Sequence, residues 1–419
     1  MGILYQYMPH TPTKDTYRHY ELLLGLEPPW EVSSISVDSA NLKLSINVAW
    51  RAGEPVMCPL CNKPCTVQDH REERSWRHLD TMQFETRIIC RVPRSSCPEH
   101  GIKTIDTPWA NDRSRFTLLF ERFAIDIINA SRSVTQAMSI LKISWEQVWL
   151  IEERAVERGI ARRADEPLVH AGIDEKNFGK GHSYVSLLTD VDRGKVLDVV
   201  PDRTKEAAEA LWRTVSKERR SSVEAVAMDM WDAFMTASKE AVPQAEIVHD
   251  KYHVASYLGK AVDDVRRKEN RILAQTGNSV LKNTKYLWLA NPNRWSADDR
   301  RSFRSLKVNE LKVGRAWSIK EAFRHFWDYA YHGSAQAFFK KWFFWATHSK
   351  IKPIIAVARM LKRHLSGILA YIKHHITNAV TEGLNSKIQI LKSNARGFRN
   401  FQHYRMAILF HCGKLSLYP

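Results

Sequence analysis

Two pairs of metal-binding side chains repeat one spacing in the first quarter of the chain. Cys58 and Cys61 form a Cys-x-x-Cys turn, and Cys97 and His100 form a second pair, also with two residues between them. A pair of this kind lets two ligands from one tight turn reach a single ion, and two pairs complete a tetrahedral zinc site. Because four good ligands leave no open position, we expect a structural Zn²⁺ that helps a small module to fold. The alternative is a set of unrelated buried cysteines. Two further thiols, Cys65 and Cys90, could also replace one of the four ligands.

Acidic residues end two short apolar runs in the middle of the chain. The run from Pro167 ends on Asp174, and the run from Val223 ends on Asp229. Short apolar runs bounded by turn residues are typical of buried strands. Further strands are predicted at 184–189, 195–200 and 245–250, with helices over 205–216 and after Asp232. Three strands, a helix, a strand, a helix and a strand follow the order of a ribonuclease-H-like fold, in which the first and fourth strands are adjacent.

Two carboxylates at adjacent strand ends repel each other unless a cation lies between them. Mg²⁺, or Mn²⁺, suits such a site because it prefers oxygen ligands, and two ions can stabilise the attacking and leaving oxygens of phosphoryl transfer. We expect Glu382 to be the third acidic ligand, because it lies on the polar face of a predicted helix over 376–391 and is the only acidic residue after Asp328. A local ion pair of Glu382 is the alternative to metal binding. Asp250 is the alternative to Asp229 as the second acid.

Positive charge is concentrated in the last 119 residues. Residues 301–419 hold 21 Lys and Arg and four acidic residues, whereas residues 1–300 hold 42 of each, so the last segment carries the whole net charge of +17. Such a field attracts polyanions, above all nucleic acid, although a solvated basic face is the alternative. With 44% apolar residues and six cysteines in 419 residues, the composition excludes wholesale disorder and a disulfide-stapled scaffold. We find no pattern of a secretory signal or a membrane span and expect a protein of a reducing compartment.

Residues 113–163 have the pattern of three short helices. We expect them over 116–128, 131–142 and 145–158, with Ser133 and Ser144 as the N-caps of the last two. A helix-turn-helix domain places the N-terminal part of its last helix in the major groove, so Gln147 and Arg154 are candidates to face DNA. A three-helix bundle that binds no DNA has the same pattern and is the alternative.

The chain resembles bacterial insertion-sequence transposases of the zinc-finger-containing DDE class, the ISL-three family. The segments that carry the resemblance follow the family's order over almost the full length: CPLC, WRHLD and CPEHG, the three helices, GIDEK at 172–176, AMDMWDAF at 227–234, VHDKYHV at 248–254, TEGLNSKI and NARGFRNF. The resemblance implies that Asp174, Asp229 and Glu382 are the DDE triad, in agreement with the strand-end interpretation. It also implies that residues 251–370 are an all-helical insertion between the fifth strand and the glutamate helix.

We therefore expect a multidomain α+β protein with six consecutive parts. These are an N-terminal segment (1–50), whose residues 35–50 alternate like a strand, a zinc-binding module (51–112), a helix-turn-helix domain (113–163), the first part of a ribonuclease-H-like α/β catalytic core (164–250), the all-helical insertion (251–370), and the second part of the core with the Glu382 helix and a basic tail (371–419).

The function that the resemblance implies is DNA transposition. The zinc module and the helix-turn-helix would bind the terminal inverted repeats of the element, and the acidic site would catalyse Mg²⁺-dependent cleavage and strand transfer into target DNA. Lys387 and Arg396 are candidates to hold backbone phosphates beside Glu382. Joining two ends requires at least a homodimer on double-stranded DNA, in the bacterial cytoplasm at the nucleoid. The alternatives are a structure-specific nuclease or resolvase, and a DNA-binding regulator without catalysis.

Overall fold

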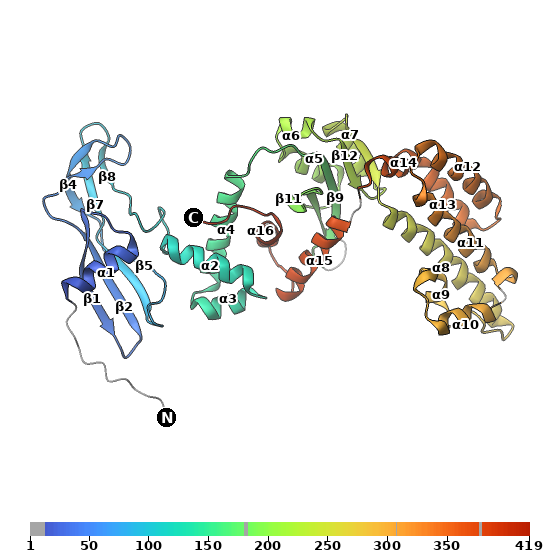
Figure 1. The fold of residues 1–419 in the computed structure, drawn as a ribbon, viewed down its shortest axis with the longest axis horizontal. Coiled ribbons are helices and arrows are strands. Elements are labelled where there is room, and N and C mark those ends of the chain that lie inside the picture. Colours follow the sequence, from blue (N-terminus) through green and yellow to red (C-terminus); the bar gives the residue numbers. More distant parts are fainter. Residues whose placement is uncertain (1–12, 180–182, 307, 377–378) are drawn as a thin grey trace, which may run out of the picture. The chain divides into compact units, whose positions relative to one another are not determined.

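The chain forms two compact units. The computed structural model describes residues 13–179, 183–306, 308–376 and 379–419. One unit comprises the chain up to Arg162 together with Ser416–Pro419, and the other comprises Arg163–Leu415 (Figure 1). Among the described residues, no helix is long and apolar enough to cross a membrane.

The N-terminal unit begins with helix α1 (Lys14–Leu24) and two four-stranded sheets. The first sheet has the order β1-β2-β6-β5, and the second has the order β3-β4-β7-β8. The strands are β1 (Trp30–Asp38), β2 (Lys43–Trp50), β3 (Val56–Met57), β4 (Pro64–His70), β5 (Arg74–Arg77), β6 (Glu85–Cys90), β7 (Pro93–Cys97) and β8 (Gly101–Thr104). A shared core of apolar side chains packs between them, including three tryptophans, Trp30, Trp76 and Trp109.

Residues 35–50 form parts of two strands and not the single strand that their alternation predicts. A turn over 39–42 separates β1 from β2, because the Asp38 carboxylate accepts the backbone N–H of Asn41 at 3.0 Å. Strand β2 then pairs in parallel with β6, from Lys43 opposite Glu85 to Val48 opposite Cys90. The expected boundary between residues 50 and 51 therefore runs between strands of one sheet.

Three helices complete the N-terminal unit: α2 (Leu118–Ala130), α3 (Val134–Leu141) and α4 (Trp145–Ala161). Ser133 accepts the N–H of Gln136, and Ser144 accepts the N–H of Gln147, so both serines are N-caps as the sequence predicts. Residues 416–419 return to this unit and contact the last turns of α4. Arg158 donates to the carbonyl of Leu417 at 2.5 Å, and Arg162 donates to the carbonyl of Tyr418 at 2.7 Å.

The second unit is built on a five-stranded sheet with the order β11-β10-β9-β12-β13. Strands β9, β10 and β11 are antiparallel neighbours, whereas β12 runs parallel to β9, and β13 runs parallel to β12. The strands are β9 (His170–Asn177), β10 (Tyr184–Asp190), β11 (Lys195–Pro201), β12 (Ala225–Met228) and β13 (Glu246–His249). Because β9 is the central strand and β12 pairs with it in parallel, the residues that follow β12 lie beside the second half of β9.

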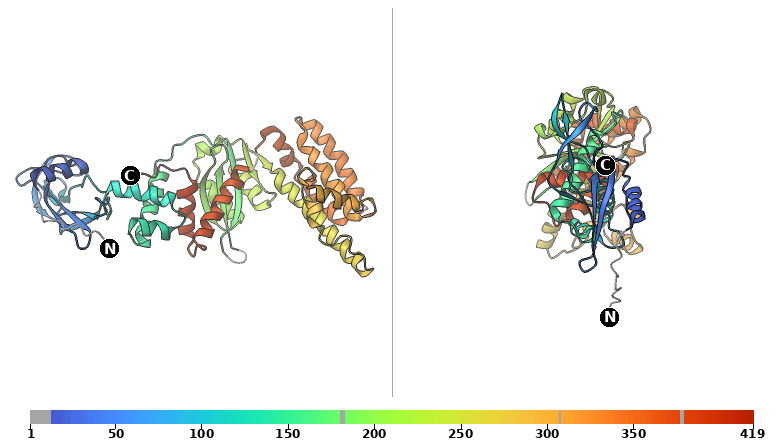
Figure 2. Two further views of the ribbon diagram at one scale, coloured as in Figure 1. Left: turned by 60° about the horizontal axis from the view of Figure 1, so that its bottom comes forward. Right: turned by 90° about the vertical axis from the view of Figure 1, so that its left-hand side faces the viewer.

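Helices flank this sheet (Figure 2). Helices α5 (Lys205–Arg213) and α7 (Asp232–Ala241) share a core with Ala171, Ile173, Val226 and Met228, so they cover one face, and α6 (Lys217–Ser221) follows α5. Helix α14 (Leu365–His374) packs against β13, α15 (Ala379–Asn394) against β9, and α16 (Phe401–Cys412) against the edge strand β11. Because Gly367 has no side chain, α14 lies directly over the buried ring of His249, where a Cβ atom would come within 2.5 Å.

Between β13 and α14 the described residues are helices and their connections. The helices are α8 (Lys251–Gln275), α9 (Lys285–Leu289), η1 (Pro292–Arg294), α10 (Ala297–Ser305), η2 (Val308–Glu310), α11 (Lys312–Phe323), η3 (Arg324–Asp328), α12 (His332–His348) and α13 (Lys352–Arg363). Trp288, Phe323, Phe326 and Trp342 are fully or almost fully buried and form the centre of their common core. Most tryptophans here are therefore packing residues, whereas Trp345 is 45% exposed.

Candidate acidic site, metal centre and nucleic-acid interface

Asp174 and Asp229 occupy equivalent positions on two neighbouring parallel strands. The last bridged pair of β9 and β12 joins Gly172 to Ala227, and the two aspartates each lie two residues further along. Ala171 and Ile173 face the core under α5 and α7. Because side chains alternate along a strand, the aspartates point to the opposite face. Asp229 directly follows β12 as predicted, whereas Asp174 lies inside β9, which continues to Asn177.

Helix α15 approaches β9 closely enough to contact Asp174. A Cβ atom on Gly172 would lie 2.6 Å from Thr189 Oγ1 and 3.2 Å from Thr381 Oγ1, so glycine permits this approach. One turn further along α15, the Asn385 amide donates to Asp174 Oδ2 at 2.5 Å. The other oxygen of Asp174 accepts the backbone N–H of the next residue at 2.9 Å. Asp174 therefore has a fixed orientation in which both oxygens have protein donors.

Asp229 is oriented in the same way by helix α8. Its Oδ1 accepts the N–H of Met230 at 2.6 Å, and its Oδ2 accepts the Tyr257 hydroxyl at 3.3 Å. His253, one helical turn before Tyr257, has its Nδ1 atom 3.4 Å from the same Oδ2. The fifth strand thus leads directly into a helix whose side chains hold the second aspartate.

Negative charge accumulates near the carboxyl ends of the neighbouring strands β9 and β12. Burial raises the pKa of Glu175, and the nearby charges of Asp174 and Asp229 raise it further. Burial and the Asp229 carboxylate together raise the pKa of Tyr257 to about 12, so this hydroxyl keeps its proton and donates. Carboxylates that crowd in this way are stabilised by a bound cation.

Glu382 lies on α15 next to Thr381, and its side chain is exposed. In the described part of the chain its carboxylate has no hydrogen bond or ion pair, so no local Lys or Arg neutralises it there. No contact joins it to Asp174 or Asp229 either. The structure therefore brings the two aspartates together by strand register and leaves Glu382 on the neighbouring helix as an unpaired acid.

The other acidic candidate has a structural contact. Asp250 is 3% exposed and caps α8, because its carboxylate accepts the N–H of Tyr252 at 3.0 Å.

The two basic candidates lie near α15. Lys387 donates to the carbonyl of His411 and so ties α15 to α16, whereas Arg396 is exposed and has a φ of 54° in the turn after α15.

The four predicted zinc ligands come together at the tips of two hairpins. Cys58 and Cys61 lie between β3 and β4, Cys97 is the last residue of β7, and His100 lies in the turn before β8. All four ligand atoms are within 4.8 Å of one another. The distances are 3.7 Å for Cys61 Sγ–Cys97 Sγ, 3.8 Å for Cys58 Sγ–His100 Nδ1 and 3.6 Å for Cys97 Sγ–His100 Nδ1. Zn–S bonds of about 2.3 Å place the sulfurs of a tetrahedral site about 3.8 Å apart, so the cluster fits one Zn²⁺.

Electrostatics favour the thiolate at two of the three cysteine ligands, Cys58 and Cys97, whereas burial and the neighbouring thiols raise the pKa of Cys61. Although burial opposes ionisation, the backbone N–H groups of His100 and Glu99 lower the pKa of Cys97 to about 7, which favours the thiolate that a metal binds. Burial alone raises the pKa of Cys90 to about 12. The Cys65 thiol bonds to the carbonyl of Lys63 at 3.4 Å, and neither spare thiol belongs to the cluster.

The two candidate DNA contacts on α4 have different surroundings. Gln147 is half-buried, and its side chain accepts the backbone N–H of Ser144 at 2.9 Å, so it completes a capping box at the start of the helix. Arg154 bonds to Glu121 at 3.0 Å, and Arg158 contacts the other oxygen of this carboxylate, which is 1% exposed. Arg154 therefore neutralises a buried acid inside the helical bundle and is not among the side chains that we assign to DNA.

Several residues that orient the aspartates were not assigned from the sequence. The signal for His253 and Tyr257 is their spacing of four residues, on one helical face, directly after a predicted strand. Asn385 follows Glu382 by three residues and so shares the polar face of the predicted helix over 376–391, yet nothing in its spacing distinguishes it from exposed neighbours. Only the close approach of α15 to Gly172 makes Asn385 a partner of Asp174.

Comparison with known proteins assigns each part of the chain to one family. A family model described as a transposase of the ISL3 (ISL-three) family matches residues 171–408, which is more than half of the chain. The zinc-finger of transposase IS204/IS1001/IS1096/IS1165 matches residues 54–100, and the helix-turn-helix domain of transposase family ISL3 matches residues 105–156.

Two curated relatives extend over most of the chain. The transposase for insertion sequence element IS1557 of Mycobacterium tuberculosis is 25% identical over 416 residues, which cover 92% of this chain and 93% of the relative. The transposase for insertion sequence element IS1001 of Bordetella parapertussis is 25% identical over 362 residues, which cover 84% and 88%. With its zinc-finger, helix-turn-helix and transposase regions in this order, the chain belongs to the ISL3 family of insertion-sequence transposases.

Proposed function

We propose that this protein cuts DNA at the ends of its own insertion sequence and joins those ends to target DNA. The observation that carries the proposal is the pair Asp174 and Asp229, which have the same register on adjacent parallel strands of a chain of this family. Their sheet order, with the first strand between the second and the fourth, supports a ribonuclease-H-like core. We interpret helices α8–α13 as an all-helical insertion into that core.

The residues at this edge fit a divalent cation. Asp174, Asp229 and Glu382 would hold Mg²⁺ or Mn²⁺, because hard cations prefer carboxylate oxygens and the crowded acids require a counter-charge. Bound ions would stabilise the charge that develops on the attacking and leaving oxygens of the phosphodiester. Since its carboxylate has no partner in the described part of the chain, Glu382 is free to turn toward the two aspartates.

The chain's own side chains position these acids. Asn385 holds Asp174, and Tyr257 together with His253 holds Asp229, so neither carboxylate needs to reorder when DNA arrives. Water would attack the phosphodiester at the element end and release a 3′-OH, which would then attack target DNA. Both steps are phosphoryl transfers at one site, and neither requires a covalent bond between protein and DNA. Arg396 and Lys387 are proposed contacts to backbone phosphates.

The N-terminal unit is proposed to recognise double-stranded DNA. The cluster of Cys58, Cys61, Cys97 and His100 would hold a structural Zn²⁺ that fixes the hairpin tips, and Gln147 would face the major groove from the start of α4. Because two ends must be joined, we propose at least a dimer on DNA, associated with the nucleoid in the bacterial cytoplasm.

The test uses the full chain, duplex DNA that carries the element ends, and Mg²⁺. Nicks that map to the ends, followed by products in which an end is joined to another duplex, are expected. Nicks without joined products would assign the protein to the structure-specific nucleases. Specific binding without nicks at any concentration of Mg²⁺ or Mn²⁺ would assign it to the regulators.

A further inference from the structure

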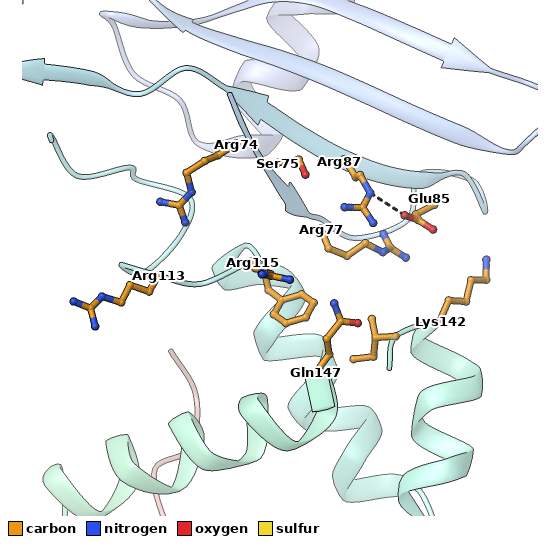
Figure 3. A pocket seen from close by; sticks show the side chains of 11 residues that line it. Arg74, Ser75, Arg77, Glu85, Arg87, Arg113, Arg115, Lys142 and Gln147 are labelled. Carbon is orange, nitrogen blue, oxygen red and sulfur yellow. Dashed lines mark hydrogen bonds and ion pairs between the residues drawn. The ribbon is translucent and has the colours of Figure 1, made fainter. Parts of the chain in front are cut away.

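A basic cleft separates the first sheet of the N-terminal unit from its helices. It encloses about 480 Å³. Figure 3 shows the sheet on one side and the helices on the other, with side chains from both around the same space. Six cationic residues line the cleft: Arg74, Arg77, Arg87, Arg113, Arg115 and Lys142. The other lining residues are the acidic Glu85 and the uncharged Ser75, Phe116, Ile143 and Gln147.

Part of this positive charge is already neutralised inside the protein. Arg77 is buried and pairs with Asp80, and Lys142 lies 3.4 Å from the same carboxylate. Arg87 pairs with Glu85 at 3.0 Å. The Arg115 side chain is exposed, and its guanidinium has no hydrogen bond or ion pair with any residue that the structure describes. The cationic side chains around the cleft outnumber the acids that pair with them, and such an excess of positive charge attracts an external anion.

Hydrogen bonds fix the two walls of the cleft to each other. The N–H of Arg77 donates to the carbonyl of Arg115, and the N–H of Thr117 donates to the carbonyl of Arg77. The His78 ring and the Thr117 hydroxyl, which caps α2, are 2.9 Å apart. Strand β5 is therefore joined directly to the segment that begins the helices, and the spacing between the walls is set by backbone contacts.

The cleft opens beside the start of α4. Gln147 lies at the third position of this helix and lines the cleft together with Ile143 and Lys142 of the preceding turn. The N-terminal turn of the last helix is the part of a helix-turn-helix that faces base edges. A strand of DNA whose phosphates occupy the cleft would therefore pass beside the residues that we propose to read its bases.

We propose that this cleft binds the sugar–phosphate backbone of duplex DNA, so that the first sheet and the helix-turn-helix hold one continuous duplex. Arg115 from the helical side and Arg87 from the sheet are the proposed phosphate contacts, and Gln147 faces the groove between them. This inference rests on the proposed DNA-binding function. It adds that the first sheet of the N-terminal unit, β1-β2-β6-β5, contacts the DNA directly. It assigns a role to arginines outside the basic segment 301–419.

The experiment measures the affinity of the full chain for duplex DNA by fluorescence anisotropy over a range of salt concentrations. Two probes of equal length are used, one with an element end and one of random sequence. The variants are Arg115→Gln, Arg87→Gln and the double variant, with Gln147→Ala as a base-reading variant. The matched control is Arg18→Gln with Arg51→Gln, because these arginines belong to the same unit, lie outside the cleft and are 65% and 50% exposed.

Each single cleft variant should weaken binding to both probes by about tenfold and reduce the slope of log K against log salt by roughly 0.9, because one phosphate contact is lost while base reading is kept. The double variant should reduce the slope by about twice as much. The preference for the element end should persist in these variants and fall in Gln147→Ala. The control should bind with the wild-type affinity and salt slope. Zinc content and circular dichroism establish that each variant is folded, and Arg113→Gln replaces any variant that is not.

Wild-type affinity and slope in the folded double variant would overturn the proposal, as would equal losses in the control. Tight binding to single-stranded DNA with no binding to duplex would also overturn it. The proposed transposase function fails by a different result, in which the wild type neither prefers element ends nor nicks them. A chain that nicks element ends while its cleft variants bind normally refutes the cleft and leaves the function in place.

Discussion

The amide of Asn385 donates to Asp174 Oδ2 at 2.5 Å, across 211 residues of sequence. This bond joins the helix of Glu382 to the central strand of the sheet, so the acidic site is assembled from both ends of the second unit. Because the amide has no charge, it orients the aspartate without neutralising it. The proposed metal ligand thus keeps its negative charge while one of its rotamers is favoured.

Replacing Asn385 by Ala should raise the Mg²⁺ concentration needed for half-maximal nicking by about 10- to 100-fold, because ligand-orienting contacts contribute this much to metal affinity. Activity should recover at high Mg²⁺, since the three acids remain. The control is Gln389→Ala, an exposed residue one turn further along α15. Unchanged Mg²⁺ dependence in a folded Asn385→Ala protein would show that the bond only packs the helix.

Replacing Glu382 by Gln should abolish nicking by orders of magnitude while folding and end binding persist. The side chain is exposed and has no partner in the described chain, so the change removes charge and little packing. The comparison is Asp250→Asn. Asn caps helices as well as Asp does, so this variant should keep the cap of α8 and most activity. Normal nicking by Glu382→Gln, with Asp250→Asn inactive, would show that the catalytic site has been assigned to the wrong acidic residues.

Replacing Cys61 by Ser should release zinc and unfold the two hairpin tips, because the bound metal is the main stabilising contribution in such a small module. Metal analysis of the purified chain and protease sensitivity around residues 51–104 measure both effects. Cys90→Ala is the matched control, because this thiol is buried outside the cluster and should leave the zinc content unchanged. Full zinc in Cys61→Ser would contradict the assigned ligand set.

The buried carboxyl of Glu152 on α4 should make the N-terminal unit less stable at high pH. Burial raises its pKa from 4.5 to about 7, so the folded chain holds a proton that the unfolded chain releases in this range. Stability should fall as the pH rises from about 4.5 to 7, by about 3 kcal/mol in total. Glu152→Gln should therefore raise the melting temperature at pH 8 and have little effect at pH 5. Equal effects at both values would exclude this linkage.

The sequence predicts those parts of the fold that depend on neighbouring residues. The caps of Ser133 and Ser144 involve groups three residues away, and the predicted helices α3 and α4 begin where these serines place them. The order of elements along the chain predicts that the first and fourth strands are adjacent, and β9 and β12 are neighbours in the sheet. The equivalent positions of Asp174 and Asp229 follow from the parallel pairing of these two strands. The ligand pairs Cys58 with Cys61 and Cys97 with His100 are equally local, because each pair lies within one turn.

What the sequence leaves open depends on contacts between distant segments. Arg154 has the spacing of a DNA contact, yet Glu121, 33 residues earlier, supplies a buried carboxylate that takes up its charge. In the predicted helix over 376–391, apolar residues recur every four positions at Ile376, Val380, Leu384 and Ile388 and predict a buried stripe. Val380 is nevertheless 37% exposed, whereas the polar Asn385 is 8% exposed. Helix periodicity predicts an apolar stripe. It does not reveal that α15 packs against β9 at Gly172 and Asp174 and not against an apolar surface.

The return of residues 416–419 to the N-terminal unit has a consequence for the order of biosynthesis. Leu417 and Tyr418 supply carbonyl acceptors to Arg158 and Arg162, which are 259 and 256 residues earlier. A ribosome therefore finishes the whole acidic site before it delivers the last partners of α4. During translation α4 therefore emerges before these carbonyls, and Arg158 and Arg162 lack these two acceptors until residues 416–419 have been synthesised.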